Sequence, residues 1–182
     1  MPLREQQNLL TRLYTDAAIR ASFFAEPARV GPEFGLEESE SLELAAVSRQ
    51  ELDFFADSLV AKRRREVERL IPSTVGPLGG DFQELFTEFA ARFVPHGHLK
   101  HLEDAIAFCD WLRGRPVRKD VHSAAAFDSA RLDFHGFRRR FRVCVGAGNG
   151  AENSRPKAAV WLRTGRGHRF FTVPLPRFLF RT

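Results

Sequence analysis

Three histidines and a cysteine in one short segment are the residues of this sequence whose spacing most suggests metal chemistry. The segment FVPHGHLKHLEDAIAFCDWLRG, residues 93–114, contains His96, His98, His101 and Cys109. Metal ligands must converge on one point, and the spacing of His98 and His101 can place both on one face of a helix. However, the sequence lacks the repeated carboxylate and histidine spacing that a dinuclear iron site in a helical bundle needs. It also contains neither HExxH nor CxxC. We therefore favour an ordinary helix beginning here, and keep a metal-dependent enzyme built on His96, His98 and His101 as the third functional hypothesis.

No segment carries the residues of a nucleophilic or phosphate-binding site. The sequence has no GxSxG elbow for a catalytic serine. Cys109 and Cys144 fall on a predicted helix and a predicted strand as packed side chains, and a packed thiol is inert. The segment GAGNG (146–150) lacks the lysine and the Ser/Thr of a phosphate-binding loop. We therefore expect a non-catalytic protein with no cofactor of its own.

Arginine concentrates in the last third of the chain. Residues 131–182 hold 12 Lys and Arg against 2 Asp and Glu, whereas residues 1–130 hold 16 against 21. Aromatic side chains lie between the basic ones, so this segment is the main candidate for binding an anionic partner. The candidate partner-binding residues are Arg138, Arg139, Arg140, Arg142, Trp161, Arg163, Arg166 and Arg169, with Lys62 and Arg63 as additions from an earlier helix.

Three interpretations of this arginine-rich segment stay open. An acidic peptide or protein could dock by charge complementarity or add a strand to the edge of a sheet. Nucleic acid could offer phosphates to arginine and bases to aromatic rings, although no RNP, KH or helix-turn-helix pattern accompanies the charge. The arginines could also serve only to keep a strand face solvated and its edge unpaired.

The sequence predicts helices in the first part of the chain and strands in the last part, and these elements must position the candidate residues named above. The clearest helix lies in SRQELDFFADSLVAKRRREVERLIP (48–72), where Ser48 and Glu51 form a capping box. Arg63 interrupts its apolar stripe. Either the Arg63 stem packs while its guanidinium reaches water or Glu66, or the side chain lies at the mouth of a cleft.

Two further helices and a boundary follow. Helical spacing of apolar residues predicts helices over 81–93 and about 98–113, and residues 115–130 could add one or two more turns. The segment PSTVGPLGG (72–80) has the composition of a hinge. It separates a helical block, residues 1–71, from residues 81–182, which hold helices and a sheet and which we expect to pack with the first block as one domain.

From about residue 137 the pattern changes to the two-residue period of strands. Apolar and arginine side chains alternate over 137–145, and KAAVWLRT (157–164) and HRFFTVPLP (168–176) flank a glycine-containing hairpin turn. Three strands need a partner for their apolar face, and the preceding helices can supply it. The predicted fold class is α+β, with an N-terminal bundle of five or six helices followed by a three-stranded antiparallel β-meander.

Composition places the chain among globular proteins. Hydrophobic residues make up 43% of the 182 residues, which is enough for a core. No apolar run is long enough for a membrane span, and the N-terminal segment lacks the apolar region of a secretion signal. We therefore expect a cytoplasmic protein with no membrane partner.

Several segments resemble a bacterial domain family associated with multinuclear non-heme iron oxidases that modify ribosomally made peptides. They are LYTDAAIRASFFAEPARVGPEFGL, FFADSLVAKRRREVERLIP, HLEDAIAFCDWL and VWLR, within residues 8–175. The resemblance implies an accessory domain, fused to or encoded beside such an oxidase, that presents a substrate while the oxidase holds the iron. The opening pattern LYTDxxxRxxFxxxP is also similar to small helical subunits of aromatic-ring dioxygenases, over about the first forty residues. The family supplies no catalytic residues to transfer.

The first functional hypothesis is therefore a non-catalytic accessory protein that presents an acidic peptide or protein partner to a separate enzyme of the iron-oxidase type. The second is a nucleic-acid-binding protein that uses the same arginine-rich segment. The two predict opposite responses to a nucleic-acid titration, because phosphate contacts make binding steeply dependent on salt.

Overall fold

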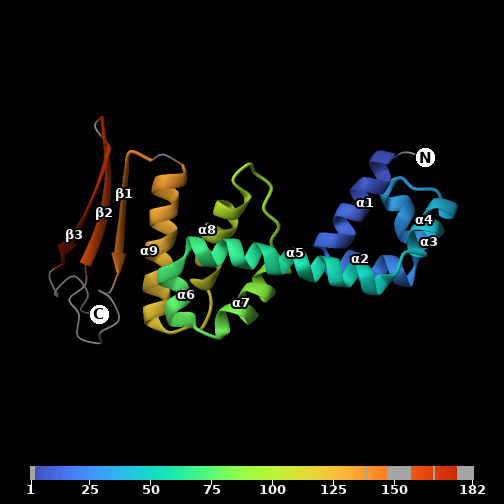
Figure 1. Ribbon diagram of the computed structural model, residues 1–182, viewed down its shortest axis with the longest axis horizontal. Helices are drawn as coiled ribbons and strands as arrows, with labels where there is room; N and C mark the ends of the chain where they lie inside the picture. The colour runs from blue at the N-terminus through green and yellow to red at the C-terminus, as the bar shows by residue number, and fades with distance from the viewer. Residues whose placement is uncertain (1–2, 138, 147–156, 166, 176–182) are drawn as a thin grey trace. The chain divides into compact units, whose positions relative to one another are not determined.

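The computed structural model describes residues 3–137, 139–146, 157–165 and 167–175. Over these residues the chain forms nine α-helices, one 3-10 helix and three strands (Figure 1). The elements are α1 (Leu3–Thr15), α2 (Ala17–Ala25), α3 (Pro27–Val30), η1 (Gly31–Phe34), α4 (Glu38–Ala45), α5 (Arg49–Leu70), α6 (Pro72–Leu78), α7 (Asp81–Ala90), α8 (Lys100–Leu112), α9 (Lys119–Gly136), β1 (Phe141–Gly146), β2 (Lys157–Thr164) and β3 (Gly167–Pro174). The predicted α+β class, with helices followed by an antiparallel three-stranded sheet, is confirmed. The helices are more numerous than the predicted five or six because several are short.

The chain divides into two compact units. The first is Met1–Lys62 with Ala90–Val94, and the second is Arg63–Phe89 with Pro95–Thr182. Helix α5 therefore contributes its first part to one unit and its last part to the other. The predicted hinge 72–80 contains α6, a short helix that Pro72 begins with its fixed backbone angle. That residues 1–71 and 81–182 form two blocks that pack together as one domain stays a prediction.

The first unit has its own apolar core. Leu9 and Leu13 of α1, Phe23 of α2 and Leu52 of α5 are buried together. Helix α5 begins where the capping box predicts, because the Ser48 hydroxyl accepts the backbone N–H of Glu51 at 3.3 Å. Local sequence thus determines the start of α5, and burial of Leu52 fixes the face that it presents to this core.

Aromatic rings fill the helical core of the second unit. Phe82, Phe86 and Phe89 lie one helical turn apart along α7, and their rings contact Phe108 of α8 with centroids 5.4–5.7 Å apart. Such tilted and edge-on ring pairs add to the burial of apolar area. Leu112 completes this face of α8. The predicted apolar stripes of the 81–93 and 98–113 segments are therefore core-facing, although α8 begins two residues later than predicted, at Lys100.

Helix α9 is much longer than the one or two turns predicted. It runs from Lys119 to Gly136 and buries Val121, Ala125, Leu132 and Phe134. The strand predicted to begin near residue 137 begins only at Phe141. The alternation that suggested an earlier strand thus falls partly on the end of a helix and on the connection after it.

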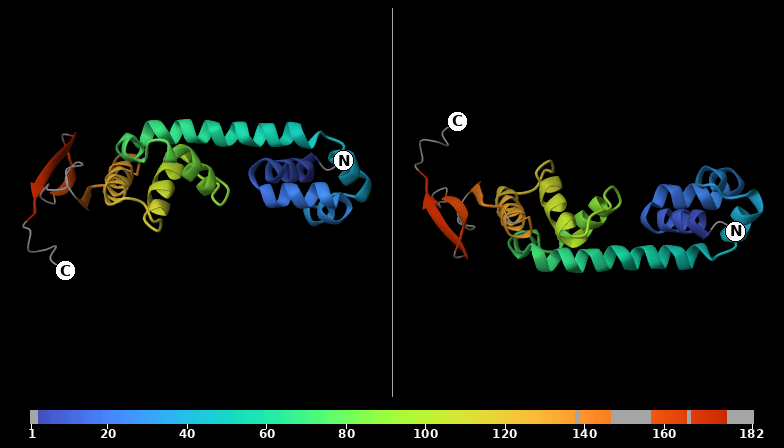
Figure 2. Two further views of the ribbon diagram at one scale, coloured as in Figure 1. Left: turned by 90° about the horizontal axis from the view of Figure 1, so that it is seen from below. Right: turned by 90° about the horizontal axis from the view of Figure 1, so that it is seen from above.

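The three strands form a sheet of order β1-β2-β3, in which each neighbouring pair is antiparallel. Helix α9 lies along the sheet on the side of β1, and β3 is the far strand (Figures 1 and 2). Ala130 and Phe134 of α9 pack against Ala159 and Trp161 of β2. This packing joins the sheet to the helical part of the second unit and gives the sheet an inner face.

Among the residues that the structure describes, none of the helices combines the length and the apolar composition required to cross a bilayer.

Candidate partner-binding surface

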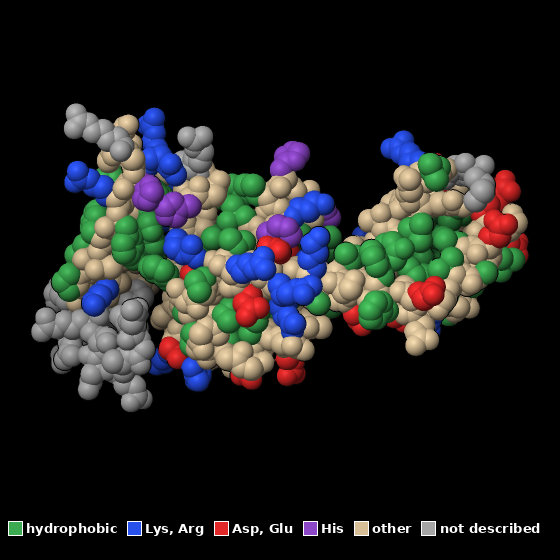
Figure 3. Space-filling view, viewed as in Figure 1, with side chains coloured by type: hydrophobic (Ala, Val, Ile, Leu, Met, Phe, Trp, Pro, Cys, Tyr) green, Lys and Arg blue, Asp and Glu red, His purple; other side chains and the backbone are tan. Residues whose placement is uncertain are grey.

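The outer face of the sheet is apolar and largely accessible. Residues directly opposite each other in neighbouring strands share a face, so the strand register assigns every side chain to one side. The rows Phe141–Leu162–Arg169, Val143–Val160–Phe171 and Val145–Ala158–Val173 form the outer face, away from α9. Six of these side chains are exposed apolar residues, Phe141, Val143, Val145, Leu162, Phe171 and Val173, whereas Ala158 and Val160 in the middle strand are buried. Hydrophobic side chains over the sheet, with Lys, Arg and His around them, are visible in Figure 3.

The inner face is the side of the sheet that the described helices cover. Trp161, Cys144 and Ala159 point toward α9, where the Phe127 ring contacts the Trp161 ring in a tilted arrangement at 5.3 Å between centroids. Trp161 is only 2% exposed. The structure therefore places this candidate binding residue in the core beneath the sheet rather than on an accessible face. The helices cover the tryptophan side of the sheet, and the apolar residues of β1 face the other way.

Strand β3 is one of the two edge strands of the sheet, with β1 at the other edge. All eight of its residues are exposed, including Phe170, Phe171 and Val173. Hydrogen bonds to β2 use one side of its backbone. The backbone groups on the other side have the geometry with which an extended peptide pairs as an added strand.

The predicted arginines do not act as one group. Arg139 and Arg142 both lie 3.4 Å from the Asp133 carboxylate of α9. Arg163 donates to the backbone oxygen of Phe134 at 3.4 Å and lies 5.2 Å from that ring's centroid, so it binds the end of α9. These three arginines attach β1, β2 and the residues just before β1 to the end of α9.

The remaining arginines of the segment differ in their surroundings. Within the described residues, the side chains of Arg140 and Arg169 have no carboxylate partner. Arg140 precedes β1, and Arg169 lies on the outer face of β3 beside Phe141 and Leu162 across the register. Arg138 and Arg166 lie outside the described residues. Among the described residues, positive charge therefore borders the apolar outer face at Arg169.

Arg63 has a partner that its own helix does not supply. Its guanidinium makes two hydrogen bonds to the Asp104 carboxylate of α8, at 2.8 and 2.7 Å. Asp104 is fully buried and the Arg63 side chain is 18% exposed, so this bidentate pair lies at the edge of the core. Neither predicted alternative, pairing with Glu66 or a cleft-mouth position, describes this pair. The neighbouring Lys62 is exposed on α5.

A second buried carboxylate joins three helices. Asp128 of α9 accepts the backbone N–H and the hydroxyl of Thr74 in α6, both at 2.9 Å. It also pairs with Arg131, which donates to the backbone oxygen of Leu70 at the end of α5. Asp128 thus caps the start of α6 from a distant helix. Burial, followed by the charge of Asp128, raises the pKa of the neighbouring Cys109 thiol to about 12.

The three predicted histidine ligands are exposed and separate. His96 and His98 lie in the connection before α8, and His101 is on its first turn. Over the described part of the chain, no three His, Cys, Asp or Glu side chains are grouped so that they could hold a metal ion. Glu103 instead binds this connection, because its carboxylate accepts the backbone N–H of Gly97 at 2.9 Å. A Cβ on residue 97 would lie 1.7 Å from that carboxylate, so a side chain there would displace the Glu103 carboxylate.

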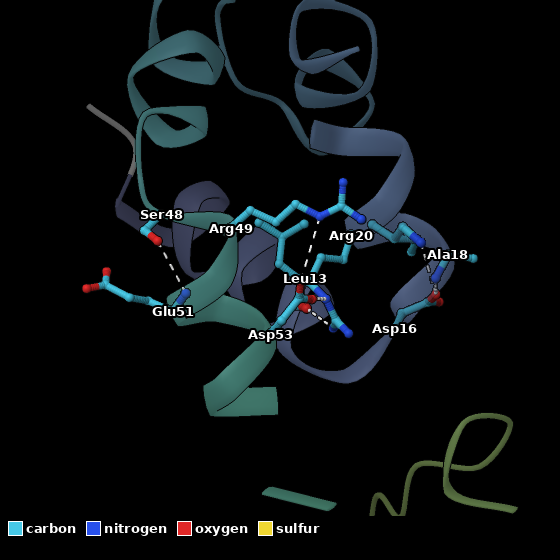
Figure 4. A network of polar contacts seen from close by, with 9 residues as sticks. Leu13, Asp16, Ala18, Arg20, Ser48, Arg49, Glu51 and Asp53 are labelled. Atoms are coloured by element: carbon cyan, nitrogen blue, oxygen red, sulfur yellow. Dashed lines mark hydrogen bonds and ion pairs between the residues drawn. The ribbon is translucent and has the colours of Figure 1, made fainter. Parts of the chain in front are cut away.

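The LYTD pattern near the N-terminus is accounted for by packing in the first unit (Figure 4). Asp16 caps α2 by accepting two backbone N–H groups at 3.0 Å. Arg20 donates to the Asp53 carboxylate of α5 and to the backbone oxygen of Leu13, both at 2.6 Å. Phe23 is fully buried. The spacing of these residues therefore corresponds to the start of α2 and its attachment to α1 and α5.

One polar group was not anticipated from the sequence. His135, in the last turn of α9, and His168, in β3, have ring centroids 4.9 Å apart. No local spacing signals this contact, because it arises only when β3 folds back along α9. Asp104 and Asp128 were missed for the same reason, since their partners are 41 and 54 residues away.

Comparison with known families matches the centre of the chain. Residues 46–133 match the model of the family described as SCO6045-like, C-terminal domain. The match takes in α5 to α8 and most of α9, and it excludes α1 to α4 and the sheet. It lies within the 8–175 range of the resemblance drawn from sequence, and its description mentions no oxidase. No curated protein and no solved structure matches the chain. The helical centre of the chain is thus similar to the C-terminal domain of SCO6045-like proteins.

Proposed function

We propose that this chain is a non-catalytic binding protein whose C-terminal sheet holds an extended segment of an acidic peptide or protein. The observation that carries the proposal is the apolar outer face of the sheet, which ends at the open edge of β3. A monomeric protein seldom leaves a contiguous apolar patch of this kind without a partner. Arg169 on the same face, with Arg140 one residue before β1, favours a partner with negative charge.

Strand addition at β3 is the binding mode that the edge supports. A peptide strand placed there would present alternate side chains to the outer face. Opposite Phe171 and Val173 an apolar residue would extend the patch, and opposite Arg169 an acidic residue would pair with the guanidinium. The expected partner sequence therefore alternates apolar residues on one face, with at least one Asp or Glu near the Arg169 end.

The test is fluorescence anisotropy with a labelled Glu/Val peptide of about eight residues, a length matched to a typical strand. It alternates Val and Ser, except for two adjacent Glu at the end that meets His168 and Arg169. A Lys/Val peptide with Lys in place of both Glu is the matched probe. We expect the Glu/Val peptide to bind and the Lys/Val peptide not to bind. Equal binding of both would show that charge has no role, and binding of neither would overturn the proposal.

Arginine variants locate the charge contribution. Arg140→Ser with Arg169→Ser should weaken Glu/Val binding by roughly three- to tenfold, because each exposed ion pair contributes about 0.2–1 kcal/mol. Arg4→Ser with Arg12→Ser, two exposed arginines of α1, is the matched control and should leave the affinity unchanged. Random RNA and duplex DNA are the comparison ligands. Tight binding of either, with a steep salt slope and no peptide binding, would favour the nucleic-acid alternative instead.

The proposal includes presentation of the bound segment to a separate enzyme, and the resemblance to oxidase-associated domains suggests a multinuclear iron oxidase. An added strand at an open edge keeps one side of the peptide accessible, which such a role requires. Gel filtration of the chain mixed with an oxidase encoded beside it provides the test. Separate elution, with and without the Glu/Val peptide, would remove the presenting role while leaving peptide binding intact.

A further inference from the structure

Two histidines from distant segments meet where α9 ends and β3 begins. The rings of His135 and His168 are nearly perpendicular, at 86°, with centroids 4.9 Å apart. Phe134 contacts both rings, with centroids 5.0 and 6.5 Å away. Both histidines are exposed, so a ligand in solvent can reach them. Figure 3 shows histidine side chains side by side over the end of the sheet, among Lys and Arg.

Positive charge lies beside this histidine pair on α9 and β2. Arg131 lies one turn earlier on α9 and Arg163 approaches from β2, whereas Arg169, next to His168 in β3, points to the opposite face of the sheet. Partial burial, followed by the charges of His168, Arg131 and Arg163, lowers the pKa of His135. The cluster therefore resists taking up another proton unless a negative charge joins it.

The acidic side chains near the end of α9 are already engaged. Asp133 pairs with Arg139 and Arg142, and Asp128 with Arg131. Among the described residues, no carboxylate forms an ion pair with His135 or His168. The positive cluster thus has room for a counter-charge from outside the chain.

A hollow beside His168 offers a place for that counter-charge. A shallow cavity of about 280 Å³ at the β2–β3 turn is lined by Thr164, Gly165, Gly167, His168 and Arg169. Gly167 has a φ of 138°, and no atom other than those of its chain neighbours lies within 4 Å of a Cβ added there. The turn therefore leaves space at the start of β3, at the Arg169 end of the open edge.

We propose that His135 and His168 bind a carboxylate of the partner segment on the side of the sheet that faces α9, and that proton uptake by the two histidines makes this binding tighter at lower pH. The inference rests on the proposed function in one respect, because the carboxylate belongs to the peptide added at β3. A bound carboxylate favours the charged imidazoles. By linkage, protonated imidazoles favour the carboxylate to the same extent.

The test compares the affinity of the Glu/Val peptide for the full chain at pH 7.5 and pH 5.5 and constant ionic strength. The glutamates stay largely ionised over this range, since their ordinary pKa is about 4.3. We expect affinity to rise about tenfold or more toward pH 5.5, because two linked protons can each contribute up to tenfold per pH unit. His135→Gln with His168→Gln should reduce the change to about twofold or less. His98→Gln with His101→Gln, exposed histidines elsewhere, should preserve it.

The outcomes separate this inference from the proposed function. Peptide binding that does not change with pH would overturn the inference and leave the proposed function standing. If the peptide binds at neither pH, the proposed function fails, and NMR titration of the imidazoles decides the anion site separately. Sulfate, which does not titrate in this range, should then raise the pKa of His135 and His168 relative to chloride at equal ionic strength. Unchanged imidazole titrations would overturn the site.

Discussion

The interior of the second unit contains charged side chains, whereas the outer face of its sheet exposes apolar ones. Asp104 and Asp128 are fully buried, yet each is matched by an arginine and by hydrogen bonds. Phe141 is 58% exposed and Phe171 46% exposed, with no covering element among the described residues. Burial of a charge is tolerated where every group has a partner, and exposure of an apolar face calls for a partner from outside. The contrast separates residues that hold the fold together from residues available for binding.

Removal of one buried partner should have the largest effect. Asp104→Ala leaves the Arg63 guanidinium without its bidentate acceptor, so we expect a loss of about 3–5 kcal/mol in the free energy of unfolding, measured by urea denaturation. The double variant Arg63→Met with Asp104→Leu replaces both charges and should be clearly more stable than Asp104→Ala. Equal instability of the two would mean that the shape of the site matters more than its charge.

The Asp128 network should respond next. Thr74→Val keeps the shape of the side chain and removes one of the hydrogen bonds that the buried carboxylate accepts. We expect a loss of about 1–3 kcal/mol in the free energy of unfolding, because a buried acceptor loses a donor. Thr87→Val is the matched control. Its hydroxyl bonds only to a backbone oxygen on exposed α7 surface, so its effect should be within about 0.5 kcal/mol.

Substitution on the sheet's outer face should separate binding from stability. Val143→Ser with Phe171→Ser should change the free energy of unfolding by less than about 1 kcal/mol, because both side chains are already exposed. The same variant should weaken binding of the Glu/Val peptide about tenfold or more, since it removes apolar contact area. Phe54→Ser, at a residue that is 76% exposed on α5, is the control and should retain binding. A large loss of stability in the sheet variant would instead make the outer face part of the core.

The reactivity of the two cysteine thiols tests the contrast between the buried interior and the accessible sheet. Burial and the charge of Asp128 raise the pKa of the Cys109 thiol to about 12, and partial burial raises that of Cys144. At pH 8 the native chain should therefore react slowly with a disulfide reagent, with Cys144 modified first. Mass spectrometry of the modified peptides identifies the order. Rapid modification of Cys109 without denaturant would show that the helical core opens.

The smallest effect should come from the histidine pair in the absence of a ligand. The pKa of His135 is lowered in the folded chain, so the unfolded chain binds more protons between that value and the ordinary value near 6.5. Stability from this residue is therefore present above pH 6.5 and is lost as the pH falls through the folded-state pKa. Thermal unfolding at pH 7.5 and 5.5 should show a smaller decrease in Tm for His135→Gln than for the unaltered chain. An equal decrease would assign the pH effect to other groups.

The comparison also shows which features were accessible from sequence. The start of α5 at Ser48 depends on a residue three positions away, and it was predicted. Helix α9 was largely missed because Asp128 and Ser129 lie in its buried face, where an apolar residue is expected. The partners of Asp128 come from α5 and α6, and no local pattern reports them.

The binding surface was predicted only in part, for a related reason. Alternation in β1 identified two sides of a strand but not which side the helices cover. Trp161, the residue that determines the answer, packs against Phe127 and Phe134 of α9, a helix that sequence spacing did not predict. The orientation of the sheet therefore depended on an element that was itself missed, and the arginines were assigned to one surface when they divide between two.

The Asp128 cap also bears on how the chain folds as it leaves the ribosome. Helix α6 receives its capping carboxylate from a residue 54 positions later, and the end of α5 receives the Arg131 guanidinium from the same helix. Until α9 has been synthesised, the start of α6 exposes backbone groups without their acceptor. The first unit depends on few residues beyond α5 and can become compact early in translation. We expect nascent chains that end before residue 128 to resist protease over the first unit and to be cleaved within α6.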